Sequence, residues 1–202
     1  MALVFWLALT LGAPLWATTM ATLVFAVHPV HVDAVVPLNN RSEMLCAIFL
    51  LAALVLWWRA KDVRIGLVAV LLGCMAGLSK EQGVLAPLLF AAPLIADWFA
   101  GKRGQERTMA QSWRPWLVGL SVLCMVAYIG LRMHALDGRF SGLISPSDNP
   151  LVETGFVARL MTAGILVMHS LRLVFWPVDL SADYSRGSIE LSDGFRGGLS
   201  TT

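Results

Sequence analysis

The chain has 202 residues, of which 57% are hydrophobic and only 14% are charged, and its formal net charge is +2. A soluble domain contains about 25% charged residues, so this composition, with a mean hydropathy of +0.72, excludes an ordinary soluble protein. Several apolar runs approach the ~20 residues that cross a bilayer as a helix, which predicts an all-α, polytopic membrane protein with about five to seven membrane helices. The small net charge gives no reason to expect a nucleic-acid partner.

The first apolar segment, residues 2–27, is interrupted at Gly12-Ala13-Pro14. Proline removes a helical hydrogen bond and clashes with the preceding turn, so the segment is either one kinked span or two short helices joined by a tight turn. In both versions the segment ends at His28, where a polar loop over residues 28–43 begins. A span from about Met44 to Trp58 follows this loop.

Basic residues follow this span and recur after the next apolar stretch, at Arg59–Arg64 and within 102–114. Cytoplasmic loops carry an excess of Lys and Arg, so both basic segments are predicted to be cytoplasmic and the 28–43 loop non-cytoplasmic. The intervening stretch, Ile65–Trp98, would make a single helix about 50 Å long, too long for one ordinary span. We therefore expect a hairpin of two short spans that turns on the non-cytoplasmic face at residues 79–83.

The C-terminal part begins with a span from about Pro115 to Leu131, followed by an external loop over 134–155 rich in turn-forming residues. Residues 156–176 are long enough to span but contain several ionisable side chains, and a charge at the bilayer centre costs at least ~2.5 kcal/mol. The pattern leaves two possibilities open, a full crossing and an interfacial or re-entrant helix. We expect a membrane domain over 1–184 and a polar tail over 185–202, which together represent the middle of a longer protein.

The 28–43 loop gathers the first groups able to do chemistry, His28, His31 and Asp33. Three interpretations stay open: a metal site, residues at headgroup level that simply end a span, and a polar site for an anionic or sugar ligand. No Gly-rich phosphate loop, Ser/His/Asp arrangement or Cys/His metal pattern occurs in the sequence. We therefore expect neither a bound metal nor a cofactor.

Cations also lie on the predicted non-cytoplasmic side, where positive charge is unusual. Lys80 and Glu81 occupy the tip of the expected hairpin. Lys80 either extends to the membrane interface or acts as a point charge in a lipid-phosphate site. Arg41, Arg132, Arg159 and Arg172 are further cations on or near this side, and an anionic partner such as a phosphate would explain them.

These motifs resemble the transmembrane and tetratricopeptide-repeat (TMTC) family. Its HPVHTEAV…GRAE signature is similar to residues 28–35 and 41–43, which read HPVHVDAV and RSE, so Val32 and Asp33 replace the usual Thr-Glu. Its KEQG turn is identical to residues 80–83. Its NP…TRLLT…P..LS.DYS segment resembles residues 149–150, 159–162 and 177–185.

The resemblance implies a C-type glycosyltransferase fold, present here incompletely, and a hexosyltransferase activity of the protein O-mannosyltransferase kind. The implied donor is a polyprenyl- or dolichyl-phosphate-linked mannose and the acceptor is a Ser or Thr of a protein. The active face would be the non-cytoplasmic face of the bacterial inner membrane or the endoplasmic reticulum. The resemblance also favours an interfacial or re-entrant position for residues 156–176.

The family's catalytic acidic residue precedes the His-Pro motif, whereas the 27 residues before His28 contain no Asp or Glu, so no catalytic residue is assigned within this chain. The alternative is a non-catalytic membrane transporter or lipid-binding scaffold on the same helices. The candidate substrate- and lipid-phosphate-binding residues are His28, His31, Asp33, Arg41, Glu43, Lys80, Glu81, Asp148, Asn149, Arg159, Asp183 and Tyr184.

Overall fold

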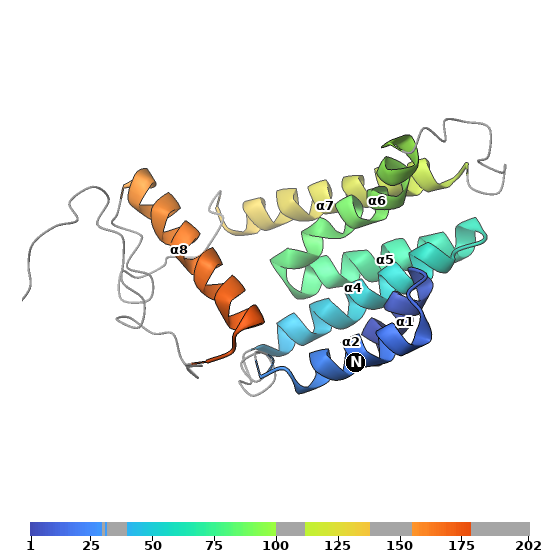
Figure 1. Ribbon diagram of the computed structural model, residues 1–202. Helices are drawn as coiled ribbons and strands as arrows, with labels where there is room; N and C mark the ends of the chain where they lie inside the picture. The colour runs from blue at the N-terminus through green and yellow to red at the C-terminus, as the bar shows by residue number, and fades with distance from the viewer. Residues whose placement is uncertain (30, 32–39, 100–111, 138–154, 179–202) are drawn as a thin grey trace, which may run out of the picture. The chain divides into compact units, whose positions relative to one another are not determined.

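A computed structural model describes residues 1–29, 31, 40–99, 112–137 and 155–178 (Figure 1). No strand occurs within these ranges, and four helical segments in them are long and apolar enough to cross a membrane. The predicted all-α membrane class is therefore confirmed.

The helices are α1 (Ala2–Thr10), α2 (Leu15–Val27), α4 (Arg41–Arg59), α5 (Val63–Ser79), the short 3-10 helix η2 (Glu81–Leu85), α6 (Ala86–Phe99), α7 (Arg114–Ala135) and α8 (Phe156–Phe175). Residues 1–135 form one compact unit, and residues 136–202 form a second.

The first apolar segment forms two helices, so of the two predicted versions the structure has the one with a tight turn. Gly12 has φ +88°, a conformation that glycine adopts at little cost, and Pro14 stands immediately before α2. At the end of α1, Thr10 Oγ1 accepts a hydrogen bond of 3.0 Å from Arg59 Nε. The Arg59 guanidinium also lies 4.6 Å from the Trp6 ring centroid, so α1 is attached to the C-terminal end of α4.

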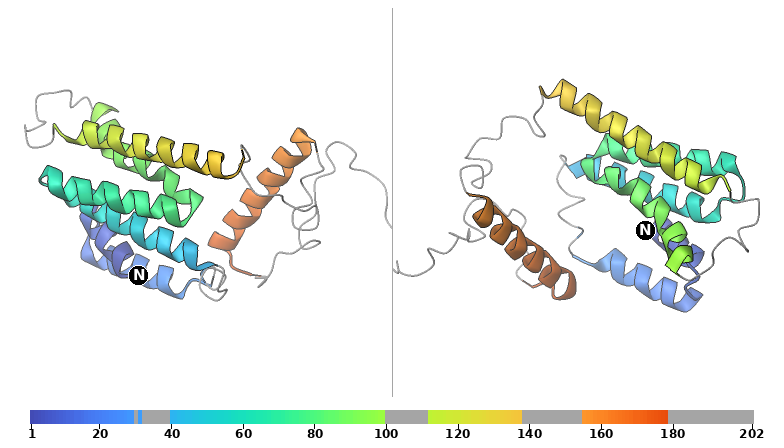
Figure 2. Two further views of the ribbon diagram at one scale, coloured as in Figure 1. Left: turned by 180° about the vertical axis from the view of Figure 1, so that it is seen from behind. Right: turned by 90° about the horizontal axis from the view of Figure 1, so that it is seen from above.

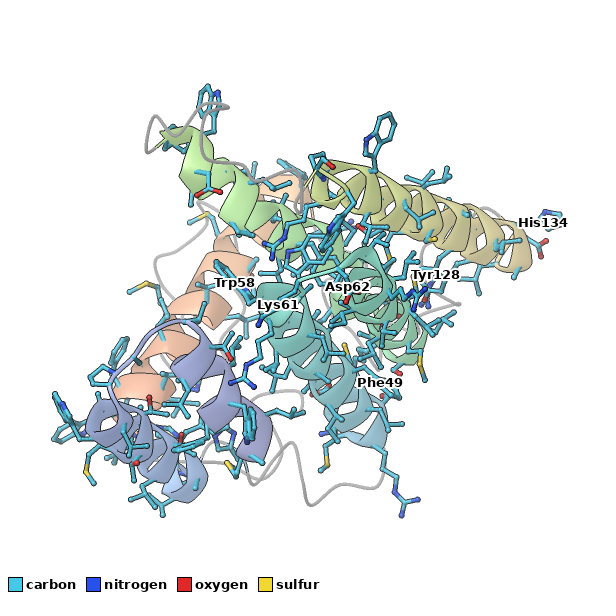
Figure 3. All side chains as sticks on the ribbon, turned by 90° about the vertical axis from the view of Figure 1, so that its right-hand side faces the viewer. Phe49, Trp58, Lys61, Asp62, Tyr128 and His134 are labelled. Carbon is cyan, nitrogen blue, oxygen red and sulfur yellow. The ribbon has the colours of Figure 1, made fainter. Side chains whose placement is uncertain are left out.

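Helices α4 and α5 form an antiparallel hairpin, and both views in Figure 2 show them side by side. The Asp62 carboxylate caps α5 by accepting hydrogen bonds from the backbone N–H groups of Arg64 and Ile65, at 2.9 and 3.1 Å. Figure 3 shows Asp62 at the turn between the two helices. The helix α4 begins at Arg41, earlier than predicted, so Glu43 lies in its first turn, where a carboxylate is favourable for the helix dipole.

One face of α5 consists mainly of glycine and alanine, and the other helices pack against it. A Cβ atom at Gly73 would lie 3.1 Å from the Phe90 ring of α6, and one at Gly77 would lie 3.0 Å from the Met125 sulfur of α7. Small residues let helix backbones approach closely in membranes, where association depends on packing. The α5 helix is therefore in contact with α4, η2, α6 and α7.

The core of the first unit is built on Trp57, which is fully buried. Its indole Nε1 donates a 3.0 Å hydrogen bond to the Phe90 carbonyl, and its ring stacks on Phe90 with centroids 4.8 Å apart. The Trp113 ring lies edge-on to Trp57 at 5.9 Å. These contacts fix α6 and the start of α7 against the C-terminal end of α4.

Arg114 was expected in the basic loop, but it is the first residue of α7 and is only 7% exposed. Its Nη2 atom donates to the carbonyl oxygens of Trp57 and Ala60, at 3.3 and 3.2 Å. The last carbonyls of a helix have no partner within the helix, so this buried cation completes the end of α4. The prediction was wrong because nothing in the sequence around Arg114 indicates that its side chain bonds to the terminal carbonyl groups of α4.

The second unit contains α8, a continuous helix of 20 residues. By length and composition it meets the requirements for a membrane span, and Arg159 lies in its first turn. Its interfacial or re-entrant position stays a prediction.

We expect Arg114→Ala to lower the free energy of unfolding by about 3 kcal/mol, because two hydrogen bonds from a charged donor are lost and the α4 carbonyls stay buried. Thermal unfolding of the chain in detergent micelles, followed by tryptophan fluorescence, measures this change. The exposed Arg64 is the matched control, and Arg64→Ala should change stability by less than about 0.5 kcal/mol. Equal effects of the two substitutions would contradict the structural role of Arg114.

Candidate functional site

The candidate site lies at one end of the first unit. We call this end the Lys80 end. The helix α4 starts here, and α5 stops at Ser79. The side chain of Arg132, near the C-terminus of α7, pairs with Glu81 and so places the end of α7 here as well. Figure 1 shows these helix ends together on its left side, with the end of α2 beside the start of α4. The residues Arg59, Lys61 and Arg64 lie at the opposite end.

Lys80 links α4 to the junction between α5 and η2. Its Nζ atom donates a 2.7 Å hydrogen bond to Oε1 of Glu43, and the two side chains are 30% and 36% exposed. This hydrogen bond raises the pKa of Lys80 above its ordinary value, while partial burial opposes the shift and the Glu81 charge adds to it. The lysine is therefore a fully charged ammonium group at neutral pH and has a fixed direction.

Glu81, the next residue, binds a different helix. Its carboxylate accepts a hydrogen bond from Arg132 Nη2 on α7. Arg132 Nη1 also donates to the hydroxyl of Tyr128, one turn earlier on α7, at 3.1 Å. Lys80 and Glu81, which are neighbours in the sequence, thus form ion pairs with α4 and α7. These pairs hold the start of α4 and the ends of α5 and α7 in one arrangement.

Gly83 completes this arrangement because η2 folds back onto the last turn of α5. A Cβ atom at position 83 would lie 2.2 Å from the backbone carbonyl carbon of Ala76 and 2.2 Å from the backbone nitrogen of Gly77. No side chain fits in that space, so the position requires glycine. This contact sets the direction of Lys80 and Glu81 relative to the helices they bind.

The two histidines follow the end of α2. His31 N donates to the His28 carbonyl oxygen at 3.3 Å, and the two rings lie 6.1 Å apart. The His31 ring packs on Phe25 with centroids 4.2 Å apart. Its Nε2 atom is buried and has no hydrogen-bond partner among the described residues.

The described residues contain no group of three or more His, Cys, Asp or Glu side chains that could hold a metal ion. Asp33, the third member of the metal-site interpretation, lies outside those residues. Any metal site here would therefore need ligands from beyond the described part of the chain.

The structure brings only some of the predicted site residues together. Glu43, Lys80 and Glu81 come together at the Lys80 end, where Arg41 is the exposed first residue of α4, whereas Arg159 belongs to the second unit. The other predicted residues that lie outside the described part are Asp148, Asn149, Asp183 and Tyr184.

Two features of the site were missed in the sequence. Arg132 was recognised as an external cation, but its pairing with Glu81 was not expected, and Tyr128 was not singled out at all. The available signal was the four-residue spacing of Tyr128 and Arg132, which places both on one face of α7. The partner on η2 is 51 positions away and leaves no such local signal.

Comparison with known proteins identifies the family. No family model and no solved structure matches the chain. The chain is 32% identical over 197 residues to protein O-mannosyl-transferase Tmtc2 of Drosophila melanogaster, a match that covers 93% of this chain and 20% of the relative. It is 31% identical over 171 residues to a protein O-mannosyl-transferase of Caenorhabditis elegans, covering 84% and 22%. This chain belongs to the TMTC family.

Human TMTC3 is 27% identical to the chain over 198 residues, with 87% of the chain and 21% of TMTC3 covered. The resemblance inferred from the His-Pro and Lys-Glu motifs is therefore confirmed. The chain spans about a fifth of the length of these curated TMTC relatives, whose names describe them as protein O-mannosyl-transferases.

We expect Gly83→Ala to destabilise the TMTC chain by at least about 2 kcal/mol, because the new methyl group must displace the α5 backbone. Gly130 on α7 is the matched control, since a Cβ atom there meets nothing within 4 Å. Gly130→Ala should stabilise the chain by up to about 1 kcal/mol through helix propensity. Thermal unfolding in micelles measures both changes, and equal melting temperatures for the two variants would contradict the close contact of η2 with α5.

The Glu43–Lys80 pair should show a coupling of about 0.5–1 kcal/mol in a double-mutant cycle of Glu43→Gln and Lys80→Met, the modest value of a partly exposed pair.

The coupling should also depend on pH, because the pKa of Lys80 is raised in the folded state. The contribution of Lys80 to the free energy of unfolding is complete below the unfolded pKa of ~10.4 and is lost as the pH rises through the folded pKa. Urea unfolding between pH ~7 and ~11 measures this dependence. Lys61→Met, at the other end of the unit, should show no coupling to Glu43→Gln. A coupling that stays constant throughout the alkaline range would be inconsistent with the ion pair.

Proposed function

We propose that this TMTC segment forms one wall of a membrane glycosyltransferase site. In the intact protein this site would transfer mannose from a polyprenyl- or dolichyl-phosphate donor to a Ser or Thr of a protein acceptor. The observation that carries the proposal is the junction at the Lys80 end, where Lys80 and Arg132 are held in fixed positions by carboxylates. The relatives' name, protein O-mannosyl-transferase, supports transfer of this kind.

The donor's leaving group is a lipid phosphate, which gains negative charge as its bond to the sugar breaks. An ammonium group has three N–H donors and a guanidinium has five. Lys80 uses one of them on Glu43, and Arg132 uses two, on Glu81 and Tyr128. Hydrogen bonds among the described residues leave the other donors of Lys80 and Arg132 for phosphate oxygens. Preorganised donors of this kind stabilise charge that develops in a transition state.

The sugar and acceptor side of the site would be formed by the histidine segment. The buried Nε2 of His31 has no hydrogen-bond partner among the described residues, and we assign His31 and His28 to the wall of the donor or acceptor pocket together with Asp33. Arg41, the first residue of α4, is a further candidate cation for the phosphate, and Arg159 is a separate phosphate-binding candidate within the second unit. The residues assigned to ordering the external loops are Glu43, Glu81, Asp148 and Asp183. Asn149 and Tyr184 are further candidate binding residues.

The chemical step needs a general base that this assignment places before His28 in the intact protein. This carboxylate takes the proton of the acceptor hydroxyl while the hydroxyl oxygen forms a bond to the anomeric carbon. The bond from that carbon to the phosphate oxygen breaks at the same centre, and the lipid phosphate leaves with the electron pair. The residues of the Lys80 end bind and neutralise this leaving group.

We place the Lys80 end on the non-cytoplasmic face. The opposite end of the first unit carries Arg59, Lys61 and Arg64, and positive residues mark the cytoplasmic side of membrane proteins. The corresponding membrane is the bacterial inner membrane or the endoplasmic reticulum, where lipid-phosphate sugars face the lumen or the periplasm.

The proposal is tested by incorporation of labelled mannose from a dolichyl-phosphate donor into a Ser/Thr-containing acceptor, with membranes that contain the intact protein. Replacing both His31 and Lys80 with Ala should lower transfer by about 100-fold, the size of the effect when a charge-stabilising donor is lost. Lys61→Ala, an exposed cation at the opposite end, should leave transfer unchanged. Unchanged transfer by the His31/Lys80 double variant would rule out these assignments.

A further inference from the structure

A cationic surface lies at the end of the first unit opposite to the Lys80 end. Three exposed side chains, Arg59, Lys61 and Arg64, follow one another closely where α4 ends and α5 begins. We call these three residues the Arg59 cluster, and Figure 3 shows Lys61 at the turn that carries it. The cluster takes no part in the transfer reaction proposed above.

The Arg59 cluster has an excess of positive charge. Within the part of the chain that the structure describes, none of its three side chains forms an ion pair, whereas Lys80 and Arg132 each have a carboxylate partner. The carboxylate in the turn is Asp62, and its Oδ1 atom accepts the two backbone hydrogen bonds that cap α5. The cluster is therefore suited to an anion that comes from outside the described residues.

Arg59 is held in a defined direction by α1. Its Nε atom donates to Thr10 Oγ1 at 3.0 Å, and its guanidinium carbon lies 4.6 Å from the Trp6 ring centroid. Neither contact uses a hydrogen of its two Nη groups. A guanidinium presents these N–H groups as a planar fork that matches two oxygens of a phosphate. Because the side chain is already ordered, binding of a phosphate costs less conformational entropy.

Exposed tryptophans place the cluster at the level of lipid headgroups. Trp98 lies in the last turn of α6 and Trp116 in the first turn of α7, and their side chains are 55% and 81% exposed. These helix ends belong to the same end of the unit as the cluster, since Arg114 bonds to the last carbonyls of α4. Tryptophan is enriched at the membrane–water interface, which is also where lipid phosphates lie.

We propose that the Arg59 cluster binds the phosphate of an anionic phospholipid in the leaflet at this end of the chain. The Arg59 fork holds the phosphate, and Lys61 and Arg64 add charge. A lipid fits better than a soluble phosphate compound because α4, which ends in the cluster, is long and apolar enough to span a membrane. The acyl chains of a lipid bound at its end therefore lie in hydrocarbon. The site is independent of sugar transfer and would attach the ends of α1, α4 and α5 to one leaflet.

The site can be tested by photolabelling. The chain is reconstituted in phosphatidylcholine nanodiscs that contain phosphatidylglycerol with a diazirine in its headgroup, and labelled peptides are mapped by mass spectrometry. The label should appear at residues 59–64, and unlabelled phosphatidylglycerol should compete at least about tenfold better than phosphatidylcholine. Equal competition by the two lipids means that the cluster only contacts the interface. Equal competition by inorganic phosphate means that its ligand is a soluble anion. Either result overturns the inference, as does absence of label from these residues.

Variants test which cations select the lipid. Each basic residue near the membrane surface strengthens the attraction to anionic lipid about fivefold, so the double variant Lys61→Gln/Arg64→Gln should lower selective labelling about 25-fold. Both side chains are exposed, and this variant keeps the contacts of Arg59 with α1. Arg41→Gln removes a charge at the Lys80 end and is the matched control, with labelling of residues 59–64 unchanged. Equal labelling of the double variant and the control overturns the inference.

A second measurement uses the stability of the chain. A lipid that binds the folded state raises the melting temperature, so phosphatidylglycerol added to detergent micelles should raise the Tm of the unsubstituted chain more than phosphatidylcholine does. The Lys61→Gln/Arg64→Gln variant should lose this difference. Arg59→Lys keeps the charge but removes the planar fork, and the difference should become smaller. The same lipid-dependent Tm shift in all three chains would contradict binding at the Arg59 cluster.

Discussion

The arrangement of the first unit depends on how closely other helices approach the backbone of α5. Gly73 and Gly77 accept the ring of Phe90 and the side chain of Met125, and η2 contacts the last turn of α5 through Gly83. In a bilayer the surrounding lipid is as apolar as the helix surfaces, so this packing takes over the role that burial from water has in soluble proteins. The polar residues of the Lys80 end depend on it, because their positions follow from where α4 begins and where α5 and α7 end.

The net positive charge of the Lys80 end is smaller than a count of its cations implies. Lys80 and Arg132 are each matched by a carboxylate, so two of the cations that made this face unusual have partners of opposite charge. Pairing of this kind lowers the cost of keeping charges close to hydrocarbon. The pairing also divides the work between two sets of groups. The carboxylates hold the cations in place, and the other N–H groups of the cations are the ones proposed to bind the phosphate.

Much of the fold followed from the sequence, because hydrophobic runs and their interruptions are strong local signals. Pro14 and Gly12 indicated a break, and the Lys80 segment indicated a reversal between two apolar stretches, both of which the structure contains. The pairing of Glu81 with Arg132 and the burial of Arg114 did not follow, because each depends on a partner more than 50 positions away. The family resemblance came from motifs such as residues 80–83, whose glycine now has a steric explanation.

The contact of Gly83 with α5 also limits how the length of this segment can vary. Lys80 and Glu81 bind α4 and α7 in different directions, while Gly83 must meet Ala76 and Gly77. Adding or removing one residue between positions 80 and 83 would rotate η2 by about a third of its turn and separate these three contacts. Single-residue insertions and deletions should therefore be far less tolerated here than in the turn at Lys61 and Asp62, where one cap is the main requirement.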